Sequence, residues 1–178
     1  MPGKINYVIK RSLAYTMDVT IVYLFVMLCL QLFVLVPLRN YFGITEDWFR
    51  VGWNVQMYVW LTISLPTWLY FICSETSKYK TTIGKRIMGL KVLNTIPNSQ
   101  ISVLTGLKRT ALKLLPWELI HIGLNLPEPI WFNEHAAFPI ATLIGIILFI
   151  GYVLYMILAV TLETPYDRLL RTRVVSQK

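Results

Sequence analysis

The sequence predicts an all-α membrane protein with three to four transmembrane helices, interfacial amphipathic segments and a short cytoplasmic two-stranded ribbon. Hydrophobic residues make up 56% of the chain and charged residues only 15%, a more apolar balance than that of ordinary soluble domains. The apolar residues also stand in long uncharged runs, without the spacing of an amphipathic helix or strand. We therefore expect a single integral membrane domain over residues 1–178.

Three uncharged runs predict membrane-spanning helices: Val19–Val36, Met57–Cys73 and Phe138–Leu162. At about 1.5 Å of rise per residue, each covers roughly 25 to 37 Å, enough to cross a hydrocarbon core about 30 Å thick. With their flanking residues, the runs predict helices over 10–36, 54–76 and 138–163.

The distribution of basic residues predicts a fourth crossing. Lys and Arg concentrate near the N-terminus, between the second run and Pro116, and near the C-terminus. Because short cytoplasmic loops are rich in Lys and Arg, we expect a multi-pass protein of the cell inner (plasma) membrane with both termini cytoplasmic. Three crossings would leave the termini on opposite sides. The segment 110–126, apolar apart from Lys113, Glu118 and His121, is the candidate for a short or re-entrant fourth helix.

One stretch of sequence occurs twice in similar form. A shift of 82 positions places TTIGKRIMGLKVL, which begins at Thr81, on the segment that contains TPYDRLLRTRVV, so that Thr82 meets Thr164 and Arg86 meets Arg168. The segments 81–94 and 164–176 are therefore predicted to lie alike at the membrane interface. Each ends in a β-prone run, Lys91-Val92-Leu93 or Arg173-Val174-Val175, and we expect these two runs to pair.

The first of these segments has the composition of a lipid-facing element. Ile83, Ile87 and Leu90 share one face of a short helix, and Lys85 and Arg86 stand beside them. Basic amphipathic segments of this kind lie along lipid headgroups. Membrane lipid, anionic at the cytoplasmic face, is therefore an expected partner.

Four charged residues are predicted to meet near the cytoplasmic ends of the helices. Arg11 and Asp18 are two helical turns apart on one face, while Glu75 ends the second helix and Asp167 follows the last. Ionisable groups at membrane depth are costly and need a partner or a role. Two interpretations stay open: a structural ion-pair network, or a cation or proton site that uses these carboxylates.

Glu118 and His121 are three residues apart, on one face of the fourth helix. They could share a hydrogen bond or form a proton relay. The same spacing is half of a di-metal carboxylate pattern, but the sequence has no second copy, so we expect no metal site. His135 is expected to be solvated in an external loop.

No signature of catalysis or cofactor binding occurs in the chain. The sequence contains no GxSxG, HExxH, GxGxxG or P-loop motif, so we expect no enzyme, no catalytic residue and no cofactor. Cys29 and Cys73 stand inside apolar runs without a CxxC partner. The net charge of +8 follows the membrane pattern, and we expect no nucleic-acid partner.

Three segments together resemble the RDD family of small polytopic membrane proteins: RSLAYTMD at Arg11–Asp18, TTIGKRIMGLKVLN at Thr81–Asn94 and YDRLLRTRVV at Tyr166–Val175. The family is named for an Arg and an Asp in its first helix and a further Asp near its C-terminus. Arg11, Asp18 and Asp167 occupy these places. The T-x-G-K-R element, with Thr82, Gly84, Lys85 and Arg86, and the ending with Arg168 and Arg173 are of the family's type. KLLPWELIH at Lys113–His121 looks like a feature of one branch of the family. Tyr166 departs from the His that the family often has.

The resemblance implies a membrane protein for which transport has been suggested. The leading hypothesis is a cation- or proton-coupled small-solute transporter that uses Arg11, Asp18, Glu75 and Asp167, with Glu118 and His121 as a relay. The alternative is a scaffold or assembly partner of another membrane complex. The candidate protein partners are a second copy of the chain, in a homo-oligomer, and another membrane protein.

Overall fold

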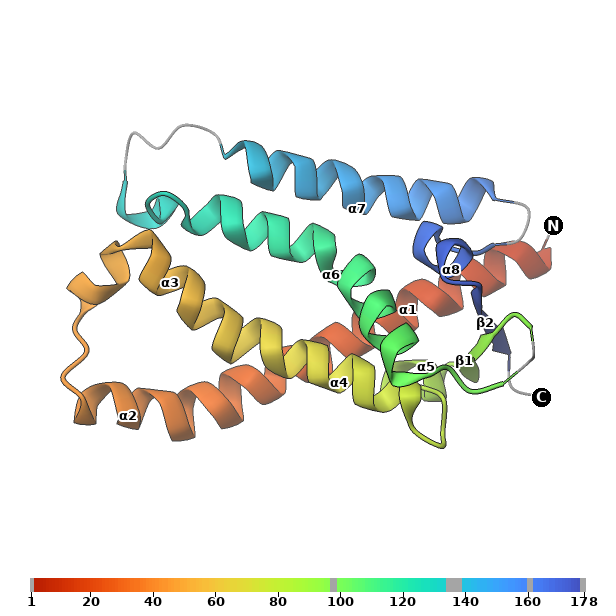
Figure 1. Ribbon diagram of the computed structural model, residues 1–178, viewed down its shortest axis with the longest axis horizontal. Coiled ribbons are helices and arrows are strands. Elements are labelled where there is room, and N and C mark those ends of the chain that lie inside the picture. Colours follow the sequence, from red (N-terminus) through yellow and green to blue (C-terminus); the bar gives the residue numbers. More distant parts are fainter. Residues whose placement is uncertain (1, 97–98, 134–138, 160–161, 177–178) are drawn as a thin grey trace. The chain divides into compact units, whose positions relative to one another are not determined.

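The computed structural model describes residues 2–96, 99–133, 139–159 and 162–176 (Figure 1). Helices dominate these residues, and three of them are long and apolar enough to cross a membrane: Ile5–Tyr41, Gly52–Thr76 and Ile140–Leu158. A two-stranded antiparallel sheet accompanies them. The predicted fold class, an all-α membrane protein with a short ribbon, is confirmed.

The first span is longer than the predicted 10–36. It consists of α1 (Pro2–Leu24), a wider π-helical segment (Phe25–Leu35) and α2 (Val36–Tyr41). The helix begins before the predicted start at Lys10. Residues 4–9 contain neither Gly nor Pro, so nothing in them interrupts it. The chain leaves the helix at Gly43, whose φ of 64° is left-handed.

The second span is continuous from residue 52 to residue 76. A 3₁₀ turn (Glu46–Arg50) precedes α3 (Gly52–Val59), a π-helical segment (Trp60–Ser64) and α4 (Leu65–Thr76). The amide of Leu65 donates to the carbonyl of Trp60, five residues back. Because Pro66 clashes with a regular preceding turn and has no N–H, this wider turn accommodates it inside the helix.

The predicted fourth helix is longer than 110–126 and has no break. α6 (Val103–Asn125) begins after Ser102, whose Oγ accepts from the amide of Thr105 at 3.1 Å, and it runs through Pro116. Lys108, Arg109, Lys113 and Glu118 lie along it, and it is not among the three described helices that qualify as spans. A 3₁₀ turn (Ile130–Phe132) leads to α7 (Ile140–Leu158), which ends before the predicted residue 163.

The two repeated segments fold alike. α5 (Ile83–Ile87) leads into β1 (Leu90–Asn94), and α8 (Pro165–Leu169) leads into β2 (Thr172–Ser176). Each pair of bounds is related by the shift of 82 positions, as are the helix caps Thr82 and Thr164. The shift also relates the left-handed residues that join helix to strand, Gly89 with a φ of 66° and Arg171 with a φ of 51°. We call each copy of this cap, helix and strand the interface module.

The strands of the two modules pair as predicted. β1 and β2 are antiparallel, with Val92 opposite Val174 and Lys91 opposite Val175. Because Val92 and Val174 are equivalent under the shift, the modules are related by an approximate two-fold axis at this pair. One sequence interpretation is wrong: Leu90 is fully buried in β1 and does not share the exposed face of Ile83 and Ile87. The period of the helix ends before Leu90, at the left-handed Gly89.

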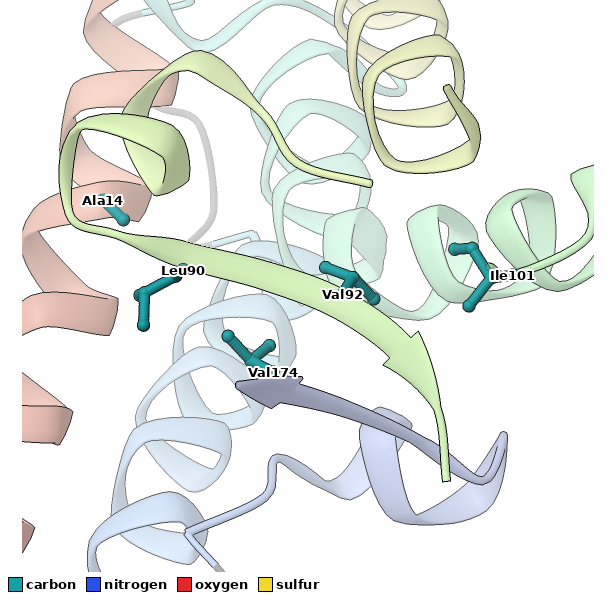
Figure 2. Packing of buried hydrophobic residues seen from close by; sticks show 5 residues of the cluster. All are labelled: Ala14, Leu90, Val92, Ile101 and Val174. Atoms are coloured by element: carbon teal, nitrogen blue, oxygen red, sulfur yellow. The ribbon is translucent and has the colours of Figure 1, made fainter. Parts of the chain in front are cut away.

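A small apolar core supports the ribbon. Ala14 of α1, Leu90 and Val92 of β1, Val174 of β2 and Ile101 form a buried cluster (Figure 2). Tyr7 packs against it and donates from its hydroxyl to the carbonyl of Val174 at 2.7 Å. The ribbon is therefore attached to α1 by both apolar packing and a hydrogen bond.

By its internal contacts the chain divides into two compact units. One comprises Met1–Ile21, Trp68–Lys113 and Ile150–Lys178, and the other comprises Val22–Thr67 and Leu114–Phe149. The first unit contains both interface modules. The single integral membrane domain over 1–178 stays a prediction.

Candidate functional site

Asp18 on α1 is a fully buried carboxylate held by neutral donors. Its Oδ1 accepts hydrogen bonds from the hydroxyl of Tyr70 at 2.6 Å and the amide of Gly84 at 2.7 Å, and its Oδ2 accepts from the hydroxyl of Thr82 at 2.5 Å. Among the described residues, Asp18 forms no ion pair. This arrangement differs from that of the other buried carboxylates.

The first interface module supplies two of these three donors. Thr82 is the cap of α5, and its hydroxyl also accepts from the amide of Lys85 at 3.4 Å. A Cβ at Gly84 would overlap the carbonyl oxygen of Ala14 and come within 2.9 Å of Asp18 Oδ1. The T-x-G sequence therefore places a hydroxyl and an amide on Asp18, and glycine lets α5 approach α1 closely.

Glu75 at the end of α4 is surrounded by three cations. Its Oε1 accepts from Lys85 Nζ at 2.5 Å and Lys113 Nζ at 2.8 Å, while its Oε2 accepts from Arg109 Nε at 2.9 Å. Glu75 and Arg109 are both fully buried. Glu75 therefore accepts three charge-assisted hydrogen bonds, and its single negative charge faces three cations.

Asp167, which lies in α8 of the second module, binds two arginines. Its Oδ2 accepts from Arg11 at 2.7 Å and from the Thr164 hydroxyl at 2.7 Å. It also accepts from the backbone amide of Thr164 at 3.3 Å, which completes the capping box of α8. Its Oδ1 accepts from Arg109 and, at 3.2 Å, from the hydroxyl of Thr172. Arg109 thus bridges Asp167 and Glu75, and its guanidinium lies 5.0 Å from the ring centroid of Tyr166.

These contacts define one buried charge cluster, which consists of Arg11, Lys85, Arg109, Lys113, Glu75 and Asp167. If every group is ionised, it holds four cations against two carboxylates. Buried charges are tolerated only when they are paired and hydrogen-bonded. The cluster meets this condition for its carboxylates and leaves positive charge in excess.

The structure brings three of the four predicted layer residues into this cluster. Arg11, Glu75 and Asp167 are connected through Arg109, whereas Asp18 has its own set of partners in the same unit. Sequence reasoning missed Arg109 and Lys113 as members. A usable signal existed: Arg109 and Lys113 are four residues apart, so they share one face of α6.

The remaining residues of the predicted motif lie at different depths. Thr82 and Gly84 contact Asp18, while Lys85 contacts Glu75. Arg86 and Arg168 are exposed. Arg173 in β2 has a buried Nε without a hydrogen-bond partner among the described residues.

The predicted relay residues lie on α6 in the second unit. Glu118 accepts a hydrogen bond from the hydroxyl of Ser64 at 3.0 Å. His121 has a buried Nδ1 with no hydrogen-bond partner in the described part of the chain. Across the described ranges, no group of three His, Cys, Asp or Glu side chains is placed to hold a metal ion. His135 lies outside the described residues.

Comparison with known protein families matches most of the chain to one family model. The family model described as the RDD family matches residues 7–171, which include Arg11, Asp18 and Asp167. No curated protein and no solved structure matches the chain.

Proposed function

Because this chain belongs to the RDD family of membrane proteins, we propose that it is a transporter that couples the movement of a small solute to that of a cation or proton. In this proposal it is a multi-pass protein of the cell inner membrane. Both interface modules face the cytoplasm, and no catalytic step is assigned to the chain.

The proposal is supported by the surroundings of Asp18, whose carboxylate is fully buried and forms no ion pair with a described residue. A carboxylate buried without a cation is costly to keep ionised, and a bound proton or small cation removes that cost. The hydroxyls of Tyr70 and Thr82 and the amide of Gly84 hold Asp18 in one orientation. Asp18 is therefore the group that takes up and releases the coupled ion.

Asp167 and Glu75 have a different role in the proposed mechanism. Each is already bound by at least two cationic side chains, so a further cation would have to displace an ion pair. Arg11 holds Asp167 and, through it, keeps α8 against α1, on which Asp18 stands. Glu118 and His121 form the relay, and Nδ1 of His121, which has no hydrogen-bond partner among the described residues, is the proton acceptor.

Flux through reconstituted vesicles tests the proposal. We expect purified protein to move protons or monovalent cations down an imposed gradient, as measured with a pH-sensitive dye and an ion-selective electrode. Asp18→Asn should abolish this flux because the amide keeps the shape but cannot exchange a proton. The matched control is Asp47→Asn, since Asp47 has a side chain that is 88% exposed and forms a surface ion pair.

Two outcomes would contradict transport: no gradient-dependent flux in the wild type, or unchanged flux in Asp18→Asn.

The second candidate function is a scaffold for another membrane complex. It rests on the three ion pairs of Glu75, which are typical of a network that holds helices together. A scaffold predicts that Asp18→Asn lowers the unfolding temperature in detergent while neither protein shows flux. It also predicts a stoichiometric partner after purification from native membranes.

A further inference from the structure

Two adjacent basic residues of the first module have different surroundings. Lys85 points to Glu75 and belongs to the buried charge cluster. Arg86 is exposed, and its guanidinium carbon lies 5.2 Å from the ring centroid of Tyr79. Lys78 Nζ lies 5.2 Å from the same ring centroid, and Tyr79 is itself 55% exposed. Neither Arg86 nor Lys78 forms an ion pair with a described carboxylate.

The second module repeats this surface with a tyrosine from another position. Arg168, the equivalent of Arg86, is exposed and donates to the hydroxyl of Tyr155 on α7 at 3.0 Å. The shift of 82 positions does not relate Tyr155 to Tyr79. The arginine is therefore a feature of the repeat, and each copy finds a different tyrosine beside it.

Each exposed arginine is followed by a large exposed apolar residue. Ile87 follows Arg86 and is 60% exposed, and Leu169 follows Arg168 and is 71% exposed. Ile83, one turn before Ile87 on the same face of α5, is 49% exposed. Charge and apolar surface thus stand side by side in both copies.

Both modules also follow a membrane span at the same distance. α4 ends at Thr76 and α7 ends at Leu158, each six residues before the capping threonine of its module, Thr82 or Thr164. The modules are therefore expected to lie where a span leaves the hydrocarbon. At that depth, a cation meets lipid phosphate and an apolar side chain meets the first acyl carbons.

We propose that each interface module binds the phosphate of an anionic phospholipid, through Arg86 in the first copy and Arg168 in the second. The adjacent tyrosine holds the guanidinium in place, and Ile83 with Ile87, or Leu169, packs on the acyl chains. A guanidinium matches a phosphodiester through paired N–H donors. A water-soluble polyanion, in contrast, would leave the exposed apolar residues without cover.

The two sites differ in strength because their charges differ. The first has Arg86 and Lys78 on one tyrosine, and neither pairs with a carboxylate of the described residues. In the second, the hydrogen bond to Tyr155 is the main cause that raises the pKa of Arg168, and the nearby Glu163 carboxylate raises it further. The negative charge of Glu163 offsets part of the attraction of Arg168 for a lipid phosphate. The first site therefore binds anionic lipid more tightly.

Native mass spectrometry of the purified full chain tests this inference. With added phosphatidylglycerol, we expect one or two lipids to stay bound to the wild type, and fewer with phosphatidylcholine. Removing each surface cation weakens such binding about fivefold. The double variant Lys78→Gln/Arg86→Gln should therefore lose most of the bound phosphatidylglycerol, and Arg168→Gln should lose less. Arg50→Gln is the matched control, because Arg50 already pairs with Asp47 at 3.4 Å.

Several outcomes would overturn the inference. These are unchanged phosphatidylglycerol binding in the double variant, an equal loss in Arg50→Gln, or equal binding of phosphatidylcholine. Displacement of the lipid by millimolar glycerol 3-phosphate would show a site for a soluble phosphate instead. If the wild type bound nucleic acid and the double variant lost this binding, nucleic acid and not lipid would be the occupant of the site. The outcome is independent of transport, because among the described residues no hydrogen bond or ion pair joins the side chain of Arg86 or Arg168 to Asp18 or to the buried charge cluster.

Discussion

Gly84 shows how little space separates the first interface module from α1. A methyl group there would overlap the backbone oxygen of Ala14, which cannot move without shifting the helix. The same residue donates its amide to Asp18 at 2.7 Å. A larger residue at this position would displace α5 and lengthen the hydrogen bond to Asp18. The bond therefore depends on the small size of glycine.

Gly84→Ala is expected to destabilise the protein by about 2–4 kcal/mol, from overpacking and the weakened hydrogen bond to a buried carboxylate. The unfolding temperature in detergent, followed by circular dichroism, measures this loss. Gly151→Ala is the control, because a Cβ at Gly151 meets nothing within 4 Å and alanine favours the helix by about 1 kcal/mol. Equal unfolding temperatures for the two variants would contradict the close approach of α5 and α1.

At the scale of elements, the short helix of each interface module depends on its cap. Helices of one turn are not stable alone, and each copy has a threonine whose hydroxyl accepts from the third helical amide at 3.4 Å. A carboxylate then accepts from that hydroxyl: Asp18 for Thr82 and Asp167 for Thr164. The first copy borrows its acid from α1, whereas the second carries its own.

The strand register of the modules is open to a direct test. In a variant with Cys29 and Cys73 replaced by Ala, we expect Lys91→Cys and Val175→Cys to form a disulfide on mild oxidation, since the two residues are directly opposite. Mobility on a non-reducing gel reports the bond. Lys91→Cys with Ser176→Cys is the control, because a slip of one residue turns the side chain to the other face. Preferential bonding of the control pair would disprove the register.

At the scale of the whole molecule, the sequence predicts the spans and the ribbon more fully than the charge cluster. Uncharged runs long enough to cross a bilayer identify the three spans, and the repeat identifies the strands through their equivalent valines. The sequence defines the ends of the helices less well, because residues such as Lys10 are compatible with helix and loop alike. The partners of Glu75 come from α5 and α6, and such long-range pairing leaves no periodic signal in a single sequence.

The ribbon also bears on whether α6 crosses the membrane. Pairing of β1 with β2 implies that α4 and α7 end on the same side, because each end lies six residues from its module. The chain must then cross once between Thr76 and Ile140. α6 is the helix in that interval, and its 23 residues give a length of about 34 Å. We therefore expect α6 to be the fourth crossing.

Cysteine accessibility in intact cells tests this topology. In the cysteine-free background, Glu128→Cys after α6 should react with a membrane-impermeant maleimide from outside. Ile96→Cys, before α6 and 88% exposed in the wild type, should react only after lysis. Lysed cells serve as the control for reactivity. Labelling of both positions from the same side would show that α6 does not cross.

The ribbon finally constrains the order in which the protein can be assembled during synthesis. β1 emerges from the ribosome long before its partner, and β2 follows only after α7. Until then, Arg11 and Arg109 lack Asp167, and Glu75 is the carboxylate available to the cations of α5 and α6. Closure of the ribbon is thus a late event that supplies the second acid and completes the buried pairing. A nascent chain stalled before Asp167 would carry Arg11 without its carboxylate partner and Arg109 with Glu75 alone.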